Sequence, residues 1–311
     1  MTIQQIKYVL AVAKYAHFET AAESCFVTQS TLSTMINKLE EEIGVFIFNR
    51  KTKPVTITKE GRKLIEQMRI VQYEMEALEN LTQELKGEMV GELRIAIIPT
   101  IAPYLLPLFL ADFANKFPKV KMIVSEMTTA NIQSSLKSRA IDVGILAIPL
   151  VDSQLDEVEL YEEPFLVYDC NSSKIAKTTS VSQLDFSNLW FLEDGHCLST
   201  QVKQICELSS DAPKKNVNFQ FKAGSLDSLM RFTKANDGIT ILPYLLSSEL
   251  KDSEKKRLIP FQNPVPVRKV GLITHKHFVK KKLLVDMEKT IKKSVAKLLP
   301  KLNGSEAIGP V

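Results

Sequence analysis

Two cysteines, Cys197 and Cys206, stand nine positions apart in the 311-residue chain, in surroundings that suit redox chemistry. Cys197 follows His196 at the mouth of a loop, a position that favours the thiolate, the reactive form of cysteine. Apolar residues at helical spacing follow it and predict a helix. In a helix, Cα atoms nine residues apart are separated by about 13.5 Å, whereas a disulfide needs them within about 7 Å. A bond between these cysteines would therefore require the helix to unfold.

The chain has the composition of an ordinary globular protein, with 45% hydrophobic and 24% charged residues. Its N-terminus lacks the layout of a signal peptide, and no apolar run is long enough to cross a bilayer. These features predict a cytoplasmic protein, and in the cytosol a structural disulfide does not persist. The cysteine pair is therefore either two packed core residues or a redox switch.

Residues 1–58 predict a winged helix-turn-helix. Apolar residues recur at helical spacing, and a tight turn ending at Thr28, a natural N-cap, places the helix-turn-helix at about 18–37. A basic turn between β-prone pieces at 48–57 predicts the wing. The polar face of the third helix is either a solvated surface or, with the wing, a surface for double-stranded DNA, and we favour DNA. The predicted DNA-binding residues are Thr28, Gln29, Ser30, Thr31, Ser33, Thr34, Asn37, Lys38, Arg50 and Lys53.

Residues 59–88 predict a linker helix that forms a coiled coil, because apolar residues recur at two heptad positions. Such a helix is about 42 Å long, which disfavours the alternative of a helix buried inside one small domain. We expect it to end at Gly87. The predicted dimerisation residues are Leu64, Met68, Val71, Met75, Leu78 and Leu85.

Residues 92–311 alternate short apolar strands with helices, which predicts an α/β domain. Ligands in open α/β sheets lie beyond the carboxyl ends of strands, and Thr100, Thr129 and the loop before Cys197 occupy such places. The basic segment 268–301 is interpreted as the solvated face of a terminal helix, with an electrostatic partner as the alternative. Strands are expected at 93–98, 122–124, 143–146, 165–167, 189–192, 217–221, 239–242 and 270–273.

The order of these parts resembles the LysR-type transcriptional regulators. The segments Phe18–Ser24, Thr28–Ser33 and Leu39–Arg50 match the N-terminal signature of that family, and the resemblance covers essentially the whole chain. It implies a two-lobed C-terminal regulatory domain similar to periplasmic binding proteins, with lobe I at about 92–162 and 267–300 and lobe II at about 163–266. It also implies a homo-oligomer, preferably a tetramer built as a dimer of dimers, that binds operator DNA and works with RNA polymerase.

The segment Leu192–Cys197 and its spacing to Cys206 are similar to the redox pair of the OxyR branch, the hydrogen-peroxide-sensing members of this family. By that resemblance Cys197 is the peroxidatic cysteine and Cys206 the resolving one. The peroxide pocket then contains Thr100, Thr129, His196 and Arg268. Hydroxyl and guanidinium donors suit this role, since they stabilise the charge that develops as the O–O bond breaks.

Together these features predict a hydrogen-peroxide-sensing transcriptional regulator, an activator of oxidative-stress genes, switched by a reversible Cys197–Cys206 disulfide. No enzymatic activity, cofactor or metal site is expected. The alternative is a LysR-type regulator that responds to a small metabolite bound between the lobes. A thiol peroxidase is disfavoured, because the Pro-x-x-x-Thr/Ser-x-x-Cys arrangement of peroxiredoxins is absent before Cys197. In the reduced protein we expect separated cysteines, with Thr100, Thr129 and Arg268 gathered near Cys197.

Overall fold

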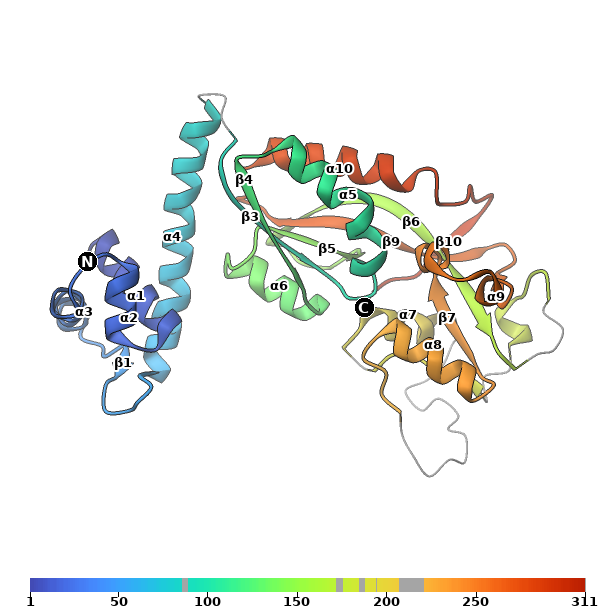
Figure 1. Ribbon diagram of the computed structural model, residues 1–311, viewed down its shortest axis with the longest axis horizontal. Helices are drawn as coiled ribbons and strands as arrows, with labels where there is room; N and C mark the ends of the chain where they lie inside the picture. Colours follow the sequence, from blue (N-terminus) through green and yellow to red (C-terminus); the bar gives the residue numbers. More distant parts are fainter. Residues whose placement is uncertain (86–88, 172–175, 185–187, 194, 207–220, 311) are drawn as a thin grey trace. The chain divides into compact units, whose positions relative to one another are not determined.

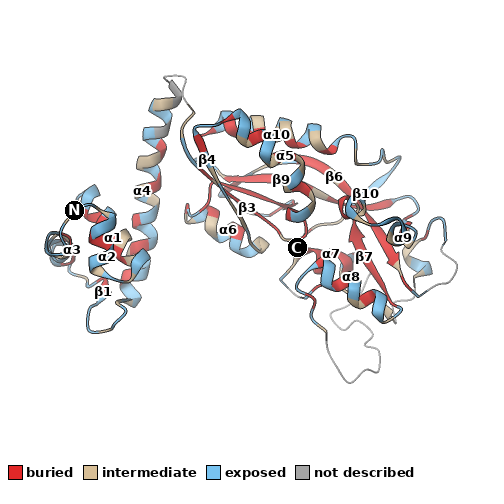
Figure 2. Cartoon of the chain, viewed as in Figure 1, coloured by how far each residue is buried: buried red, intermediate tan, exposed pale blue. Residues whose placement is uncertain are grey.

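The computed structural model (Figure 1) describes residues 1–85, 89–171, 176–184, 188–193, 195–206 and 221–310. They form two compact units: unit 1 contains Met1–Met89 and Ser138–Ala140, and unit 2 contains Val90–Lys137 and Ile141–Val311. Figure 2 shows the buried residues of unit 2 concentrated on its strands and on one side of its helices. Within the described part of the chain, none of the helices has the length and apolarity that a membrane span requires.

Unit 1 contains the predicted winged helix-turn-helix. Helix α3 begins where the Thr28 hydroxyl accepts a hydrogen bond from the backbone N–H of Thr31, at 3.2 Å. Its apolar stripe of Leu32, Ile36 and Leu39 is fully buried in the core of the unit. The helix-turn-helix and the two-stranded wing are therefore confirmed. The elements are α1 (Ile3–Tyr15), α2 (Phe18–Ser24), α3 (Gln29–Ile43), β1 (Phe48–Asn49), β2 (Thr56–Ile57) and α4 (Lys59–Leu85).

Helix α4 divides the predicted heptad stripe into two parts. Leu64 and Met68 pack into the core of the winged helix-turn-helix, so they stabilise their own unit. Val71 and Leu78 lie farther along and are 38% and 56% exposed, while Met75 is half-buried. The side chain of Leu85 and the expected helix end at Gly87 lie outside the described residues. Only the later part of the stripe is thus free for a partner helix.

Unit 2 is built on a mixed sheet with the strand order β4-β3-β5-β9-β6-β7, to which β8 adds beside β6 and β10 beside β9. Strand β3 pairs in parallel with β4 and β5, whereas β6 and β9 pair antiparallel over most of their length. The strands are β3 (Gly91–Ile97), β4 (Val120–Glu126), β5 (Val143–Ile148), β6 (Leu155–Asp169), β7 (Ile239–Pro243), β8 (Leu258–Pro260), β9 (Val265–His275) and β10 (Ser305–Ala307).

The helices of unit 2 cover this sheet, and α5 and α10 lie together over it (Figure 1). Helix α10 buries Leu283, Met287 and Ile291 and exposes most of its lysines, as predicted for a terminal helix with a solvated basic face. The helices are α5 (Ala102–Lys116), α6 (Thr129–Lys137), α7 (Cys197–Ile205), α8 (Leu226–Ala235), α9 (Asp252–Lys255) and α10 (Lys281–Val295), with 3-10 turns η1 (Val181–Gln183) and η3 (Tyr244–Glu249).

Most predicted strands are confirmed, two differ from the structure, one lies largely outside the described residues, and two short strands were not predicted. The strand expected at 165–167 is the end of the much longer β6, whose first half was missed because it carries several acidic residues. The strand expected at 189–192 is wrong: this segment makes only single bridges, and Trp190 is fixed by an edge contact with Phe232. Of the strand expected at 217–221, residues 217–220 lie outside the described part. The short strands β8 and β10 were also missed.

Candidate redox and DNA-binding sites

Cys197 is the first residue of α7, and its side chain is buried, with 6% exposure. The chain reaches this position through Gly195, whose φ of +104° is one that glycine adopts without strain. The backbone N–H groups of Cys197 and Leu198 point toward the thiol sulfur. The N-terminal end of a helix carries a partial positive charge, so this position stabilises a thiolate when one forms.

Side chains from two other elements surround the Cys197 sulfur. Thr129, the first residue of α6, places its hydroxyl beside the sulfur, and Arg268 on β9 contributes its positive charge. The Thr129 oxygen is buried and forms no hydrogen bond of good geometry with any described residue, so its proton stays available. Burial raises the pKa of the Cys197 thiol, and Arg268, Thr129 and the helix N–H groups lower it, with a net rise. In the resting protein Cys197 is therefore a protonated thiol with hydrogen-bond donors around it.

Arg268 is held by two partners in the interior of unit 2, where it is 1% exposed. Its Nε donates to Glu163 Oε2 at 2.8 Å, and its Nη2 lies 2.7 Å from the same oxygen. Its Nη1 donates to the hydroxyl of Thr100 and its Nη2 to the Thr100 carbonyl, each at 3.1 Å. Burial acts to lower the pKa of Arg268, but Glu163, Tyr161 and Cys197 raise it. The guanidinium is thus charged and fixed in orientation.

Thr100 follows β3 and is 2% exposed. Because its hydroxyl oxygen accepts from Arg268, the hydroxyl proton remains for another acceptor. The structure therefore brings together Thr100, Thr129, Arg268 and Cys197. His196 is the N-cap of α7, is half-buried, and makes no side-chain capping bond.

Glu163 and Tyr161 on β6 were missed by sequence reasoning. Glu163 is fully buried and directly opposite Arg268 in the β6–β9 ladder. Tyr161 lies two residues earlier, on the same face of the strand, and its buried hydroxyl has no hydrogen-bond partner among the described residues. In the sequence, Glu163 follows another glutamate and resembles a solvated surface position, so only the strand register reveals it.

Cys206 lies at the other end of α7, as its C-cap, and is 4% exposed. It belongs to an apolar core that includes Leu198, Val202 and Cys170. Burial alone raises the pKa of Cys206 to about 12. All four cysteines are free thiols. Since α7 is helical between Cys197 and Cys206, their Cα atoms are about 13.5 Å apart, too far for a disulfide.

The predicted DNA-binding residues lie on the surface of unit 1, on α3 and the wing. Thr28, Gln29, Ser30, Thr31, Thr34, Asn37, Lys38 and Lys53 are exposed.

Ser33 is half-buried, and Arg50, although exposed, is bound to other residues of unit 1. Arg50 binds the buried carboxylate of Glu40 at 3.0 Å, the Ser33 hydroxyl at 3.1 Å and the face of Phe18. Glu40 also accepts hydrogen bonds from the backbone N–H groups of Ile47 and Phe48. Arg50 therefore joins the wing to α3, a structural role that its prediction as a DNA-binding residue did not include.

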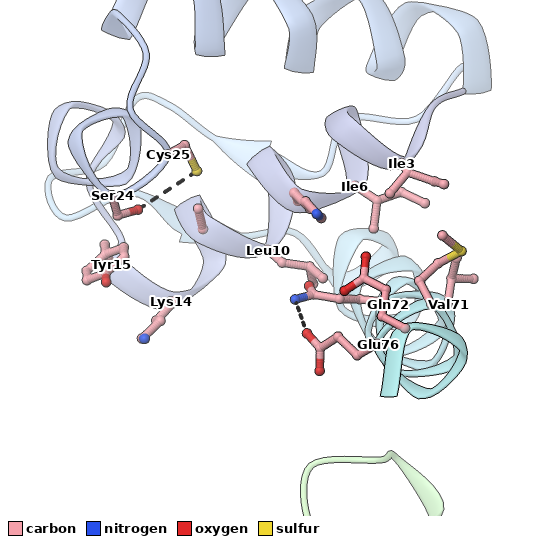
Figure 3. Close-up of a pocket in the computed structure, with 14 residues that line it drawn as sticks. Ile3, Ile6, Leu10, Lys14, Tyr15, Ser24, Cys25, Val71, Gln72 and Glu76 are labelled. Atoms are coloured by element: carbon pink, nitrogen blue, oxygen red, sulfur yellow. Dashed lines mark hydrogen bonds between the residues drawn. The ribbon is translucent and has the colours of Figure 1, made fainter. Parts of the chain in front are cut away.

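A groove of about 530 Å³ lies within unit 1, between α1 and α4 (Figure 3). Its apolar lining includes Ile3, Leu10, Val71 and Met75. Two of these are predicted dimerisation residues, so the groove extends the apolar surface of α4 onto α1. None of the predicted peroxide-pocket residues lines it.

Comparisons with known proteins agree with this architecture. Residues 3–62 match the bacterial regulatory helix-turn-helix of the LysR family, and residues 86–286 match the LysR substrate binding domain. The chain is 34% identical over 276 residues to a "Hydrogen peroxide-inducible genes activator" of Pectobacterium carotovorum, covering 88% of this chain and 90% of that protein. The same identity, over 88% of this chain and 89% of the relative, relates it to the "DNA-binding transcriptional dual regulator OxyR" of Escherichia coli K12.

A full-length OxyR variant from Pseudomonas aeruginosa has a similar solved structure, with a TM-score of 0.78 and 25% identity. The match covers 97% of this chain and 99% of that one. The chain therefore belongs to the LysR family of bacterial transcriptional regulators, and within it is similar to the OxyR branch.

Proposed function

We propose that this protein is a hydrogen-peroxide-responsive transcription factor in which Cys197 detects the oxidant. The observation that carries the proposal is the surroundings of Cys197: a buried thiol at a helix N-terminus, beside the Thr129 hydroxyl and near the fixed Arg268 guanidinium. The names of the relatives, which include hydrogen peroxide-inducible activators, support the same function.

The first chemical step is attack of the Cys197 thiolate on one peroxide oxygen. An S–O bond forms, the O–O bond breaks, and the departing hydroxide takes up the proton that the Cys197 thiol released on ionising and becomes water, leaving a sulfenic acid on Cys197. Negative charge develops on the departing oxygen. The Thr100 and Thr129 hydroxyls and the second N–H of Arg268 Nη1 are the donors available to stabilise it.

In the second step the sulfur of Cys206 attacks the sulfur of the sulfenic acid. An S–S bond forms, the S–O bond breaks, and a second water leaves. The two sulfurs meet only if α7 unwinds, because a helix holds them too far apart. Oxidation is thereby coupled to a refolding of the regulatory domain, which is how a local redox event gains a global effect.

The exposed face of α3 and the wing support DNA binding, with a cytoplasmic homo-oligomer placing its recognition helices on successive half-sites. The groove between α1 and α4 supports assembly through a partner helix. Activation of oxidative-stress genes, through contact with RNA polymerase, and a tetrameric working form complete the proposal.

The test treats reduced protein with one equivalent of hydrogen peroxide per subunit, followed by alkylation, digestion and mass spectrometry. We expect a disulfide-linked peptide pair containing Cys197 and Cys206, while Cys25 and Cys170 remain alkylated thiols. DNA footprinting of reduced and oxidised protein, with Cys197→Ser as the control, tests the consequence. Free thiols at both positions, or a footprint unchanged by oxidation, contradict the proposal.

A further inference from the structure

Arg268 and Glu163 form a buried ion pair whose net charge is zero. Arg268 and Glu163 are 1% and 0% exposed, so water screens neither of them. Nε and Nη2 of Arg268 lie 2.8 and 2.7 Å from the same carboxylate oxygen. Arg268 still lowers the pKa of the Cys197 thiol, and the carboxylate in direct contact with the guanidinium offsets part of its charge.

Both oxygens of Glu163 are engaged. Oε2 binds Arg268, and Oε1 accepts the backbone N–H of Leu245 at 2.7 Å. This second bond ties the carboxylate to the start of η3, so Glu163 is held independently of Arg268. The carboxylate thus determines where the guanidinium lies and offsets its charge.

The groups that lie nearest the pair add no positive charge to it. Tyr161 on β6 and Tyr104 on α5 are the neighbouring titratable groups, and both are neutral phenols at pH 7, because burial raises the pKa of each. Asp227 and Glu249 lie near Tyr104 and also raise its pKa. On the side of Cys197, Thr129 of α6 and the N–H groups of α7 contribute dipoles, and the half-buried His196 directly precedes Cys197.

We propose that Glu163 is a positioning and specificity-determining residue, which fixes Arg268 and offsets its charge so that the site admits an uncharged oxidant and disfavours anionic ones. The inference rests on the proposed function, because it assumes that Cys197 is the reacting group. An unpaired arginine at the same place would attract anions and hold Cys197 as a thiolate at rest. With Glu163 present, the hydrogen-bond donors of Arg268 keep their positions, but the site attracts anions less strongly.

The test measures alkylation of Cys197 by neutral iodoacetamide and by anionic iodoacetate across pH 6 to 9, in the reduced full-length protein, with peptide-resolved mass spectrometry. Glu163→Gln keeps the shape and one acceptor but removes the charge. We expect the thiolate fraction of Cys197 at pH 7 to rise roughly tenfold. We also expect the ratio of the iodoacetate rate to the iodoacetamide rate to rise several-fold. A variant that only loosened the site would speed both reagents alike.

Asp142→Asn is the matched control. Asp142 is also a fully buried carboxylate, paired with Arg94 at 3.5 Å, but it precedes β5, at the end of the parallel strands opposite to Thr100. This variant should leave the reagent ratio at Cys197 unchanged. An equal change in both variants, or no change in Glu163→Gln, overturns the inference.

A second measurement needs no variant and covers the case in which Glu163→Gln fails to fold. In native wild-type protein, an arginine whose charge is offset by Glu163 predicts only a slight iodoacetate preference at Cys197 relative to the urea-unfolded chain. A tenfold preference for iodoacetate would show an uncompensated arginine and overturn the inference. Neither arm uses peroxide, so failure of Cys197 to react with hydrogen peroxide would defeat the proposed function and leave these results interpretable.

Discussion

The two ends of α7 carry the same residue type at nearly the same burial, yet their surroundings differ. Cys197 is 6% exposed and faces a hydroxyl, a guanidinium and two helix N–H groups. Cys206 is 4% exposed and is surrounded by apolar side chains, with burial as the sole cause of its raised pKa. A buried thiol with only apolar neighbours is unreactive, whereas a thiol that is equally buried but has polar partners can ionise and react.

The largest effect that this comparison predicts is a division of roles between the cysteines. Cys197→Ser should abolish oxidation by stoichiometric peroxide, because burial among apolar side chains raises the pKa of the Cys206 thiol. Cys206→Ser should still form a sulfenic acid on Cys197, trapped by dimedone and detected by mass spectrometry. Rapid oxidation of Cys206 in the Cys197→Ser variant would remove the distinction between the two ends.

The next prediction compares the loss of the Thr129 hydroxyl with the loss of the hydroxyl of its neighbour Thr128. Thr129→Val should slow peroxide oxidation of Cys197 by about 10- to 100-fold, since a donor to the departing oxygen is lost. Stopped-flow measurement of the reduced protein gives the rate. Thr128→Val is the control: Thr128 accepts the N–H of Asn131 at 3.4 Å at the start of α6. Its loss should cost about 1 kcal/mol of stability and leave the rate unchanged.

A smaller effect concerns alkaline stability. The folded state raises the pKa of Cys206 to about 12, while an unfolded thiol titrates near about 8.5. The neutral thiol is therefore favoured by folding, and its contribution is complete below about pH 8.5 and is lost as pH rises toward 12. Between pH 7 and 10, wild type should lose about 2 kcal/mol more unfolding free energy than Cys206→Ala. Urea unfolding at several pH values measures this, and parallel curves would argue against an apolar site.

The smallest predicted effect concerns Gln201, which lies on α7 between the two cysteines. Gln201, fully buried on α7, donates from Nε2 to the carbonyl of Ile308 at 2.9 Å and so ties the helix to the C-terminal segment. Gln201→Leu should weaken α7 by about 1 kcal/mol and speed disulfide formation a few-fold. The exposed Gln204→Leu on the same helix is the control. Timed quenching and mass spectrometry give the rate, and equal rates in both variants would mean that this bond does not restrain unwinding.

The sequence was most informative where structure is local. Helical spacing and the Thr28 cap predicted α3 and its turn, because both depend on residues within a few positions. The helix α7 could be predicted for the same reason. Glu163 could not be predicted, since its pairing with Arg268 depends on the register of two strands and joins residues 105 positions apart. The bond between Arg50 and Glu40 likewise needed the fold of the wing onto α3.

The bond between Thr100 and Arg268 closes a span of 168 residues. Contacts of such separation form only after much of the chain has been ordered. During synthesis Cys197 is made long before Arg268, so a nascent chain that ends between them carries the thiol without its guanidinium. The proposed sensing site is therefore complete only after Arg268 has been made and the strand that carries it has joined the sheet.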